Sequence, residues 1–211
     1  ANPKYKQIVY KQSRKWDYLL SDNPFSTEKF QSCFMYEKDK ILELGYPAND
    51  PLYDKDLDKK ADELKTKLGI PKNKKVLLYA PTWRDDNSYG AGEYKFELAL
   101  DLKRLKEEIG DEYVILLRMH YWIVDKLDLT GMSDFVINVS NYSDITDIYI
   151  VSDICMTDYS SVFFDYANLK RPILYYMYDL EKYRDVLRGF YLDIEKELPG
   201  PILQTNDEVI D

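Results

Sequence analysis

The sequence contains very little histidine and cysteine. Among 211 residues there are one histidine and two cysteines. Zinc sites in proteins are built mainly from several Cys and His ligands, so this composition argues against a zinc site. Cys33 and Cys155 stand in different contexts, the second inside an apolar run. We therefore expect both thiols to be reduced, as is typical of a cytoplasmic chain.

The sequence also lacks an excess of basic charge and a long apolar run. It has 29 Lys and Arg residues against 38 Asp and Glu residues, a net charge of −9, which argues against nucleic acid as a partner. An anionic ligand is still compatible with this charge, because a phosphate site needs only a few local donors. No apolar run approaches the roughly 20 residues needed to cross a bilayer, and no signal peptide is recognisable. Because the chain begins at Ala1, we expect an upstream part to be missing.

What is present is the composition of a folded protein with a real core. Hydrophobic residues make up 45% of the chain and aromatic residues 15%, with 20 tyrosines. "STEKFQSCFMY" reads as a helix opened by a capping box at Ser26 or Thr27. "LGYPAND" at 44–50 reads as a boundary. We therefore predict that residues 1–50 close a larger domain and that residues 51–211 form the main one.

From residue 51 onward, helical and strand patterns alternate. Apolar residues at helical spacing predict a helix over residues 56–68 that ends at Gly69. Further helices are predicted over 97–109, in "DITDIYIVS" and over 160–169. Short apolar runs predict buried strands in "KKVLLYAPTW", "EYVILLRMH", "DFVINVS", "DICMT" and "RPILYYM". This alternation predicts an α/β fold, a doubly wound layer with a mostly parallel sheet flanked by helices.

In such a sheet, ligands collect at the carboxyl ends of the strands. We therefore expect one edge to gather two arginines, the only histidine and several hydroxyl residues. The five predicted strands deliver, in chain order, Thr82, Trp83, Arg84, Asp85 and Asp86; Arg118 and His120; Ser140, Asn141 and Tyr142; Thr157, Asp158, Tyr159, Ser160 and Ser161; and Tyr175, Tyr176 and Tyr178. Asp85 and Asp86 read as solvated turn residues, and we expect neither a metal nor a cofactor.

Ser160 and Ser161 lie where a helix should begin. The first N–H groups of a helix have no internal partner and carry partial positive charge, so this point suits a diphosphate. The alternative is that one serine merely caps the helix. Asp165 follows Ser161 by four residues among apolar neighbours and needs a partner. A ribose hydroxyl would supply one, and a salt bridge to Lys170 or Arg171 is the alternative.

Four stretches of the sequence resemble a known family. They are "YAPTWRDD" (79–86), "LLRMH" (116–120), "SDICMTDYSSVFFDYANLKRPILYYMYDLEKYRD" (152–185) and "RGFYLDIEKELPGPI" (188–202). They resemble the CDP-glycerol glycerophosphotransferases, the teichoic-acid poly(glycerol phosphate) polymerases of Gram-positive bacteria. The resemblance runs over most of residues 40–211.

The resemblance implies a GT-B-type fold with two Rossmann-like domains. Residues 51–211 would be the carboxyl-terminal, CDP-glycerol-binding domain, and residues 1–50 the end of the amino-terminal, acceptor-side domain. The family transfers glycerol phosphate from CDP-glycerol to a teichoic-acid or related polyol-phosphate acceptor and releases CMP. Its members are cytoplasmic and peripheral on the inner face of the cell membrane, here through parts outside this chain.

The resemblance also implies roles for single residues. Arg118, Met119 and His120 of the "RMH" motif, together with Ser160 and Ser161, would approach the diphosphate. Asp165 would hold the ribose, and Thr82, Trp83 and Arg84 would line the same pocket. His120 would be the catalytic residue that donates to the leaving phosphate, because an imidazole can donate near neutral pH.

The sequence departs from the family pattern in one respect. A second histidine of the family, the expected general base, has no counterpart here, so this chain is predicted to bind donor without turnover. A carboxyl-terminal basic segment is absent as well. Three alternatives stay open: a transferase that uses CDP-ribitol or another activated polyol, a UDP-sugar glycosyltransferase, and a nucleotide-binding module without catalysis.

Overall fold

The structure is a computed structural model that describes residues 3–82, 98–119, 127–187 and 189–211. The chain divides into two units, Ala1–Pro51 and Leu52–Asp211. Near the end of the first unit, Gly45 has a φ of 78°, a conformation that favours glycine. A 3₁₀-helical segment at Pro47–Tyr53 then connects the first unit to the second. The sequence-based boundary lies between residues 50 and 51.

The first unit is small and carries two parallel strands. Its elements are α1 (Pro3–Ser13), β1 (Leu19–Ser21), α2 (Pro24–Cys33), a 3₁₀ turn (Lys38–Lys40) and β2 (Ile41–Glu43), with Leu19 opposite Ile41. The predicted cap of α2 at Ser26 or Thr27 is wrong. Asn23 is the N-cap, and its Oδ1 accepts the N–H of Ser26 at 2.8 Å. Pro24 then fits the first helical position, where its missing N–H costs nothing.

The second unit is a six-stranded parallel sheet with helices on both faces. Its elements are α3 (Leu57–Leu68), β3 (Lys75–Ala80), α4 (Leu102–Ile109), β4 (Tyr113–Leu117), β5 (Val136–Asn138), α6 (Ile145–Val151), β6 (Ile154–Thr157), α7 (Val162–Tyr166), a 3₁₀ turn (Ala167–Leu169), β7 (Ile173–Tyr176), α8 (Leu180–Lys182), a π-helical turn (Tyr183–Leu187), α9 (Ile194–Glu197), β8 (Ile202–Leu203) and α10 (Asn206–Ile210). The strand order is β5-β4-β3-β6-β7-β8, and all pairs are parallel. The predicted fold class is confirmed.

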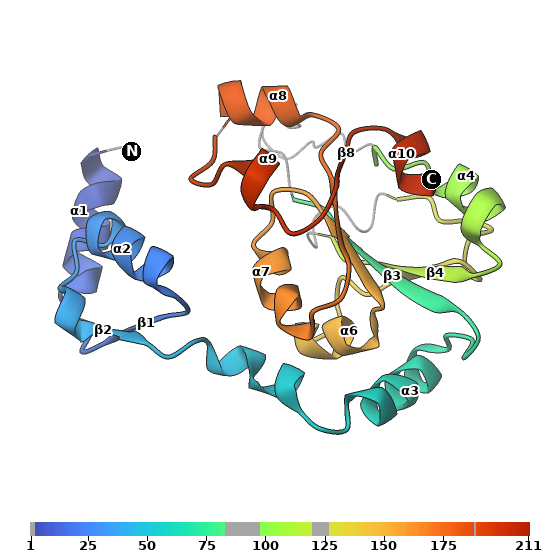
Figure 1. Ribbon diagram of the computed structural model, residues 1–211, viewed down its shortest axis with the longest axis horizontal. Helices are drawn as coiled ribbons and strands as arrows, with labels where there is room; N and C mark the ends of the chain where they lie inside the picture. Colours follow the sequence, from blue (N-terminus) through green and yellow to red (C-terminus); the bar gives the residue numbers. More distant parts are fainter. Residues whose placement is uncertain (1–2, 83–97, 120–126, 188) are drawn as a thin grey trace. The chain divides into compact units, whose positions relative to one another are not determined.

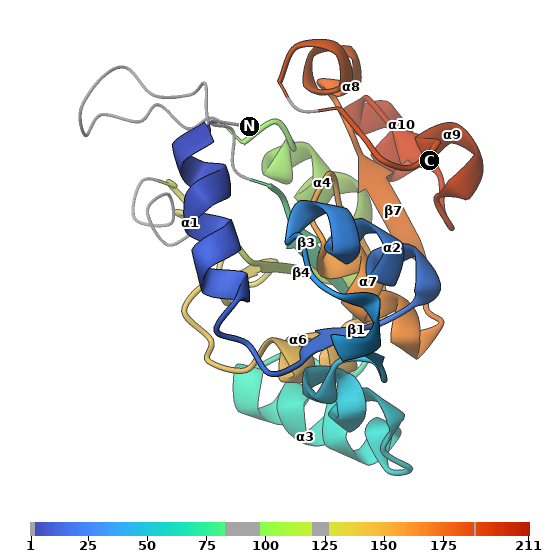
Figure 2. The ribbon, with the colours of Figure 1, turned by 90° about the vertical axis from the view of Figure 1, so that its left-hand side faces the viewer.

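Alternate residues of the strands enter two separate cores. Val76 and Leu78 of β3 pack on the side of α3, α6 and α7. Leu77 and Tyr79 pack on the opposite side with α4 and the end of α10. Figures 1 and 2 show α4 on one side of β3 and β4, with α3 and α6 on the other. Because both faces are covered, the strands are continuous apolar runs rather than alternating ones.

Helix ends follow local signals in the sequence. Gly69 ends α3 with a φ of 70°, as predicted. The helix predicted from residue 97 begins instead at Leu102, because the Asp101 side chain accepts the N–H of Arg104 and caps it. The helix predicted over 160–169 consists of α7 and a 3₁₀ turn. The edge strand β8 was not predicted.

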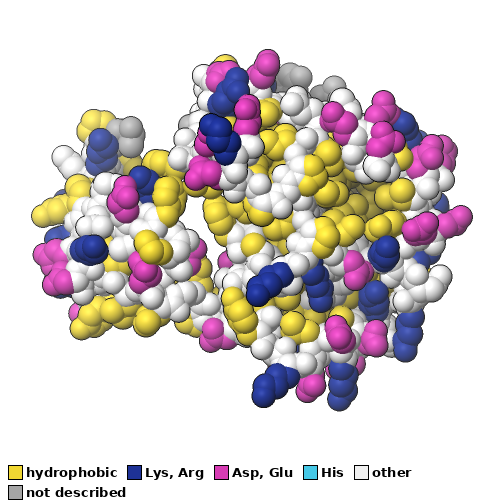
Figure 3. All heavy atoms as spheres, viewed as in Figure 1, with side chains coloured by type: hydrophobic (Ala, Val, Ile, Leu, Met, Phe, Trp, Pro, Cys, Tyr) yellow, Lys and Arg dark blue, Asp and Glu magenta, His cyan; other side chains and the backbone are white. Residues whose placement is uncertain are grey.

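The surface mixes charges of both signs. On the face in Figure 3, basic side chains of the second unit gather toward the bottom of the view and acidic ones toward the upper right, with some of each sign in both areas. None of the helices in the described part of the chain combines the length and the hydropathy of a bilayer-spanning segment.

Candidate functional site

Three neighbouring strands end at the same level of the sheet. Tyr79 of β3 lies opposite Leu117 of β4 and Met156 of β6, so the residues that follow these strands emerge side by side. Five of the predicted site residues belong to these strand ends: Thr82, Arg118, Met119, Ser160 and Ser161. Three others, Trp83, Arg84 and His120, lie outside the described residues.

Asp158 ties the ends of β3 and β6 together. It directly follows β6 and is only 1% exposed. Its Oδ1 accepts the N–H of Thr82 at 2.8 Å and the N–H of Tyr159 at 2.6 Å. A buried carboxylate that accepts main-chain N–H groups fixes the direction of both chain segments. Asp158 was expected at this edge from the sequence but without a role, although an acid directly after an apolar strand indicates a carboxylate at a strand end.

Arg118 is a half-buried cation at the end of β4. Its N–H donates to the carbonyl oxygen of Tyr79 at 2.9 Å, which extends the pairing of β4 with β3 by one residue. Its Nη1 donates to the carbonyl oxygens of Val139 and Tyr142, each at 3.0 Å. Burial lowers the pKa of Arg118 below its usual value. Within the part of the chain that the structure describes, both side-chain partners of this guanidinium are carbonyl oxygens and none is a carboxylate.

Met119 enters the site only through its backbone. Its side chain is 6% exposed and lies in the core beside α4. Its N–H donates to Ser140 Oγ at 2.9 Å. The residue that precedes His120 is therefore anchored both by packing and by a hydrogen bond.

The two serines after β6 have different environments. Ser160 Oγ accepts the N–H of Val162 at 3.3 Å, within the first turn of α7. Ser161 is exposed, occupies the N-cap position and makes no side-chain cap bond. The Ser160 hydroxyl thus accepts an N–H at the start of the helix, and the Ser161 hydroxyl makes no hydrogen bond to the described residues.

Asp165 is half-buried on α7, one turn after Ser161. Its carbonyl oxygen accepts from Asn168 Nδ2 at 2.8 Å. Arg171, one of its predicted alternative partners, uses Nη1 for the carbonyl oxygens of Ile150 at 2.7 Å and Ser152 at 2.6 Å. These bonds account for Arg171 without a salt bridge to Asp165.

An aromatic stack borders the same edge and was missed from the sequence. The rings of Tyr159 and Tyr183 are 3.7 Å apart and nearly parallel, at 11°. Phe190 stacks on Tyr183 at 5.7 Å, and the Tyr159 hydroxyl donates to Asp179 Oδ1 at 3.0 Å. Aromatic stacking of this kind stabilises the loops after β6 and β7. With 20 tyrosines in the chain, composition alone did not single these out.

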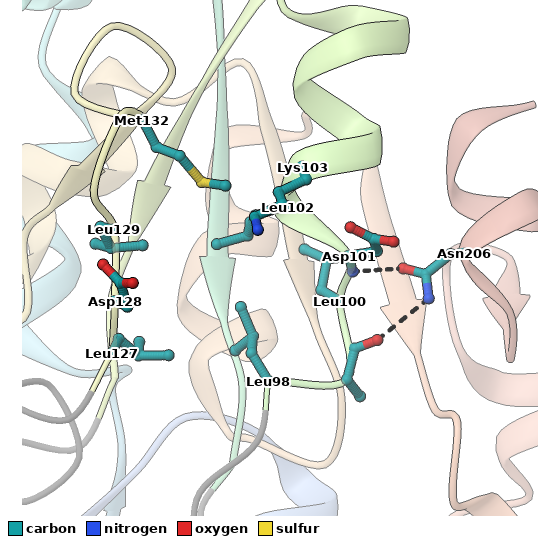
Figure 4. A pocket seen from close by; sticks show the side chains of 11 residues that line it. Leu98, Leu100, Asp101, Leu102, Lys103, Leu127, Asp128, Leu129, Met132 and Asn206 are labelled. Carbon is teal, nitrogen blue, oxygen red and sulfur yellow. Dashed lines mark hydrogen bonds between the residues drawn. The ribbon is translucent and has the colours of Figure 1, made fainter.

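A pocket of about 480 Å³ lies between the segment before α4 and the loop at 127–132. Figure 4 shows leucine and methionine side chains around it, with Asn206 on the α10 side. Asn206 accepts the N–H of Asp101 at 2.8 Å and donates to the carbonyl oxygen of Ala99 at 3.2 Å. None of the predicted site residues that the structure describes lines this pocket.

Comparison with known proteins identifies the family. The sequence model of the family described as CDP-glycerol:poly(glycerophosphate) glycerophosphotransferase matches residues 1–211. The chain belongs to this family. The resemblance in the four sequence stretches is therefore confirmed across the whole chain.

Relatives and solved structures agree with this family. The chain is 51% identical over 208 residues to the teichoic acid poly(glycerol phosphate) polymerase of Bacillus subtilis, covering 99% of this chain and 28% of that protein. It is 51% identical to the teichoic acid glycerol-phosphate transferase of Staphylococcus aureus, covering 98% of this chain and 53% of that protein. A structure of the wall teichoic acid polymerase TagF superposes with a TM-score of 0.92 at 49% identity, over 99% of this chain and 51% of that one. The chain thus spans at most about half the length of these relatives.

Proposed function

We propose that this chain is the CDP-glycerol-binding half of a glycerophosphotransferase. The enzyme would transfer glycerol phosphate from CDP-glycerol to a teichoic-acid or related polyol-phosphate acceptor. Residues 51–211 would form the donor domain, and residues 1–50 the end of the acceptor-side domain. Arg118 carries this proposal, because a half-buried arginine without a described carboxylate partner, at the carboxyl edge of a parallel sheet, suits a bound diphosphate.

The proposed donor site combines residues from three strand ends. Arg118, the Met119 backbone, His120 and the two serines would surround the diphosphate. Asp165 would accept a ribose hydroxyl, and Thr82, Trp83 and Arg84 would complete the pocket. The tie between Asp158 and the N–H of Thr82 supports this grouping, since it holds the β3 end against the β6 end.

The proposed reaction is an in-line displacement at phosphorus. An acceptor hydroxyl oxygen attacks the β-phosphorus, which bears the glycerol, and forms a new P–O bond. The P–O bond to the bridging oxygen breaks, and CMP leaves with that electron pair. The hydroxyl proton passes to a base, and His120 would donate a proton or hydrogen bond to the leaving phosphate. Cationic donors such as Arg118 would stabilise charge that builds up on the phosphoryl oxygens.

Identity to relatives favours glycerol over ribitol. The chain is 50–51% identical to proteins named for glycerol phosphate. It is 32% identical to the teichoic acid poly(ribitol-phosphate) polymerase of Bacillus spizizenii. A structure of TagF with CDPG superposes on 100% of this chain at a TM-score of 0.89. By analogy, we propose a location on the inner face of the cell membrane, reached through parts outside this chain.

A ligand-dependent melting experiment tests the donor assignment. Ligand that binds only the folded state at 100 times its Kd raises the free energy of unfolding by about 2.7 kcal/mol. CDP-glycerol and CDP are expected to raise the Tm by several degrees, and UDP, UDP-sugars and ADP much less. CDP-ribitol is the arm that separates the two polyols. Equal shifts with every nucleotide would overturn the cytidine assignment and leave only a general diphosphate site.

A further inference from the structure

The turn at residues 139–142 holds the guanidinium of Arg118 from one side. A guanidinium has five N–H groups, two of them on Nη1. Both Nη1 groups are engaged by the carbonyl oxygens of Val139 and Tyr142. In the described residues, no acceptor contacts Nε or Nη2. The turn therefore fixes the plane of the guanidinium through Nη1, and its hydrogen bonds do not use the Nε–Nη2 edge. Two parallel N–H groups on such an edge can bind a phosphate in a bidentate manner.

The same turn also holds the backbone next to Arg118. Ser140 Oγ accepts the N–H of Met119 at 2.9 Å, and the N–H of Ser140 donates to Asn138 Oδ1 at 3.0 Å. Ser140 is half-buried, whereas Asn138 is exposed. The chain that leaves β4 is thus held at two consecutive residues, at one by its side chain and at the other by its backbone.

The turn is itself anchored to two helices. The Tyr142 hydroxyl donates to Asp147 Oδ2 on α6 at 3.1 Å and accepts from Lys67 Nζ on α3 at 2.8 Å. Lys67 Nζ also lies 4.9 Å from the centre of the Tyr142 ring, and Lys60 Nζ lies 2.9 Å from Asp147 Oδ1. Tyr142 thus connects helix packing on one face of the sheet to the position of Arg118.

We infer that Ser140 and Tyr142 are positioning residues that orient Arg118 toward the diphosphate of CDP-glycerol. This inference rests on the proposed function. An arginine side chain loses much rotamer freedom when it is fixed on a ligand. A side chain that is already fixed in the free protein does not lose this freedom on binding, so affinity rises. Ser140 and Tyr142 were expected at this edge from the sequence, but neither was assigned a role.

Single hydroxyl removals test the inference. Tyr142→Phe removes the bonds to Asp147 and Lys67, and Ser140→Ala removes the acceptor for the Met119 N–H. Each variant is expected to weaken CDP-glycerol binding by about 3- to 10-fold, the affinity equivalent of ordering one flexible side chain on binding. Ser140→Thr keeps the hydroxyl and is expected to restore most of the affinity. The measurement is titration calorimetry with CDP-glycerol on the full chain.

Tyr53→Phe is the matched control. Tyr53 is an exposed tyrosine of the second unit whose hydroxyl donates to Asn168 Oδ1 at 2.6 Å. It too joins two segments far apart in the sequence, but it has no connection to Arg118. This variant is expected to bind CDP-glycerol as the unaltered chain does. An equal loss in Tyr53→Phe and Tyr142→Phe would overturn the inference, because it would show a general effect of lost stability.

A double-mutant cycle separates positioning from a merely structural role. Arg118→Ala is expected to weaken binding by at least about tenfold. In that background, Tyr142→Phe is expected to have no further effect, because the side chain that it orients is gone. The same fold-loss in both backgrounds would overturn the positioning role while leaving the donor site intact. Unchanged affinity in Arg118→Ala itself would overturn the proposed diphosphate site, and the inference with it.

Discussion

At the scale of single residues, the two serines after β6 differ in what their hydroxyls contact. Ser160 accepts a main-chain N–H of α7, and Ser161 makes no cap bond. Ser160→Ala is expected to lower the free energy of unfolding by about 1 kcal/mol, and Ser161→Ala to leave it unchanged. The double variant is expected to bind CDP-glycerol at least about tenfold more weakly, since each hydrogen bond to a charged group contributes roughly 1.5–3 kcal/mol. Titration calorimetry and denaturant unfolding report these two effects separately.

Asp165→Asn tests the ribose contact on the same helix. The amide keeps the shape of the side chain but accepts hydrogen bonds without a full charge, and charged hydrogen bonds are about twice as strong. We expect CDP-glycerol affinity to fall several-fold and the Tm without ligand to change little, because Asp165 is only half-buried. Wild-type affinity in Asp165→Asn and in the double serine variant together would contradict the donor site at α7.

The two thiols are expected to react very differently. Burial raises the pKa of Cys155 to about 12, whereas Cys33 is exposed. Because the thiolate is the nucleophile, a thiol reagent at pH 8 should label Cys33 quickly and Cys155 only on unfolding. The raised folded-state pKa also means that Cys155 favours folding below its unfolded pKa of about 8.5, and that this contribution declines as pH rises toward 12. Cys33→Ser is the control and should abolish the rapid phase. Rapid labelling of two thiols in the folded chain would contradict the burial of Cys155.

At the scale of elements, the strands buried on both faces were the most predictable. β3, β4, β6 and β7 are continuous apolar runs, and each lies where the sequence predicted a strand. β8 escaped prediction because it has two residues, both only partly buried. The beginning of α4 was misplaced although its cap, Asp101, is of a residue type that signals a helix start in a sequence.

The candidate site was predictable only in part. Parallel topology alone indicates that Arg118 and Ser160 emerge at one edge. It does not reveal that Arg118 binds two carbonyl oxygens of a distant turn, or that Asp158 accepts the N–H of Thr82. These are hydrogen bonds to the main chain, and residue spacing carries no signal for an acceptor whose position depends on the fold.

The pairing of β7 with β8 depends on Gly200. A Cβ at this position would lie 1.9 Å from the carbonyl oxygen of Ile173, so Gly200→Ala is expected to lower the free energy of unfolding by roughly 1–3 kcal/mol. Gly69→Ala is the matched control. Its Cβ would meet no atom within 4 Å, and its cost of about 1 kcal/mol arises from positive φ alone. Denaturant unfolding compares the two, and a smaller loss for Gly200→Ala would contradict the close approach.

At the scale of the whole molecule, a net charge of −9 coexists with the proposed site for an anionic diphosphate. Because the net charge is negative, attraction of a diphosphate would come from local donors rather than from the overall field. This agrees with a binding site that uses a few strand-end residues and a helix start.

The 211-residue chain is expected to bind CDP-glycerol without transferring glycerol phosphate. It spans at most about half the length of its relatives, and its one histidine is assigned to the leaving phosphate rather than to the attacking hydroxyl. The measurement is CMP release in the presence of a glycerol-phosphate acceptor, with binding checked by calorimetry on the same sample. Rapid CMP release would show that this half carries its own general base.

The strand order has a consequence for biosynthesis. β3 is central, but one of its neighbours, β6, is made much later: Thr157 Oγ1 donates to the carbonyl oxygen of Ala80 across 77 positions in the sequence. At roughly 5–20 residues per second on the ribosome, this interval lasts about 4–15 s. Until then, the growing chain carries an apolar strand with one edge open to pairing with other chains. The yield of folded protein should therefore depend on how quickly the ribosome passes from residue 80 to residue 157.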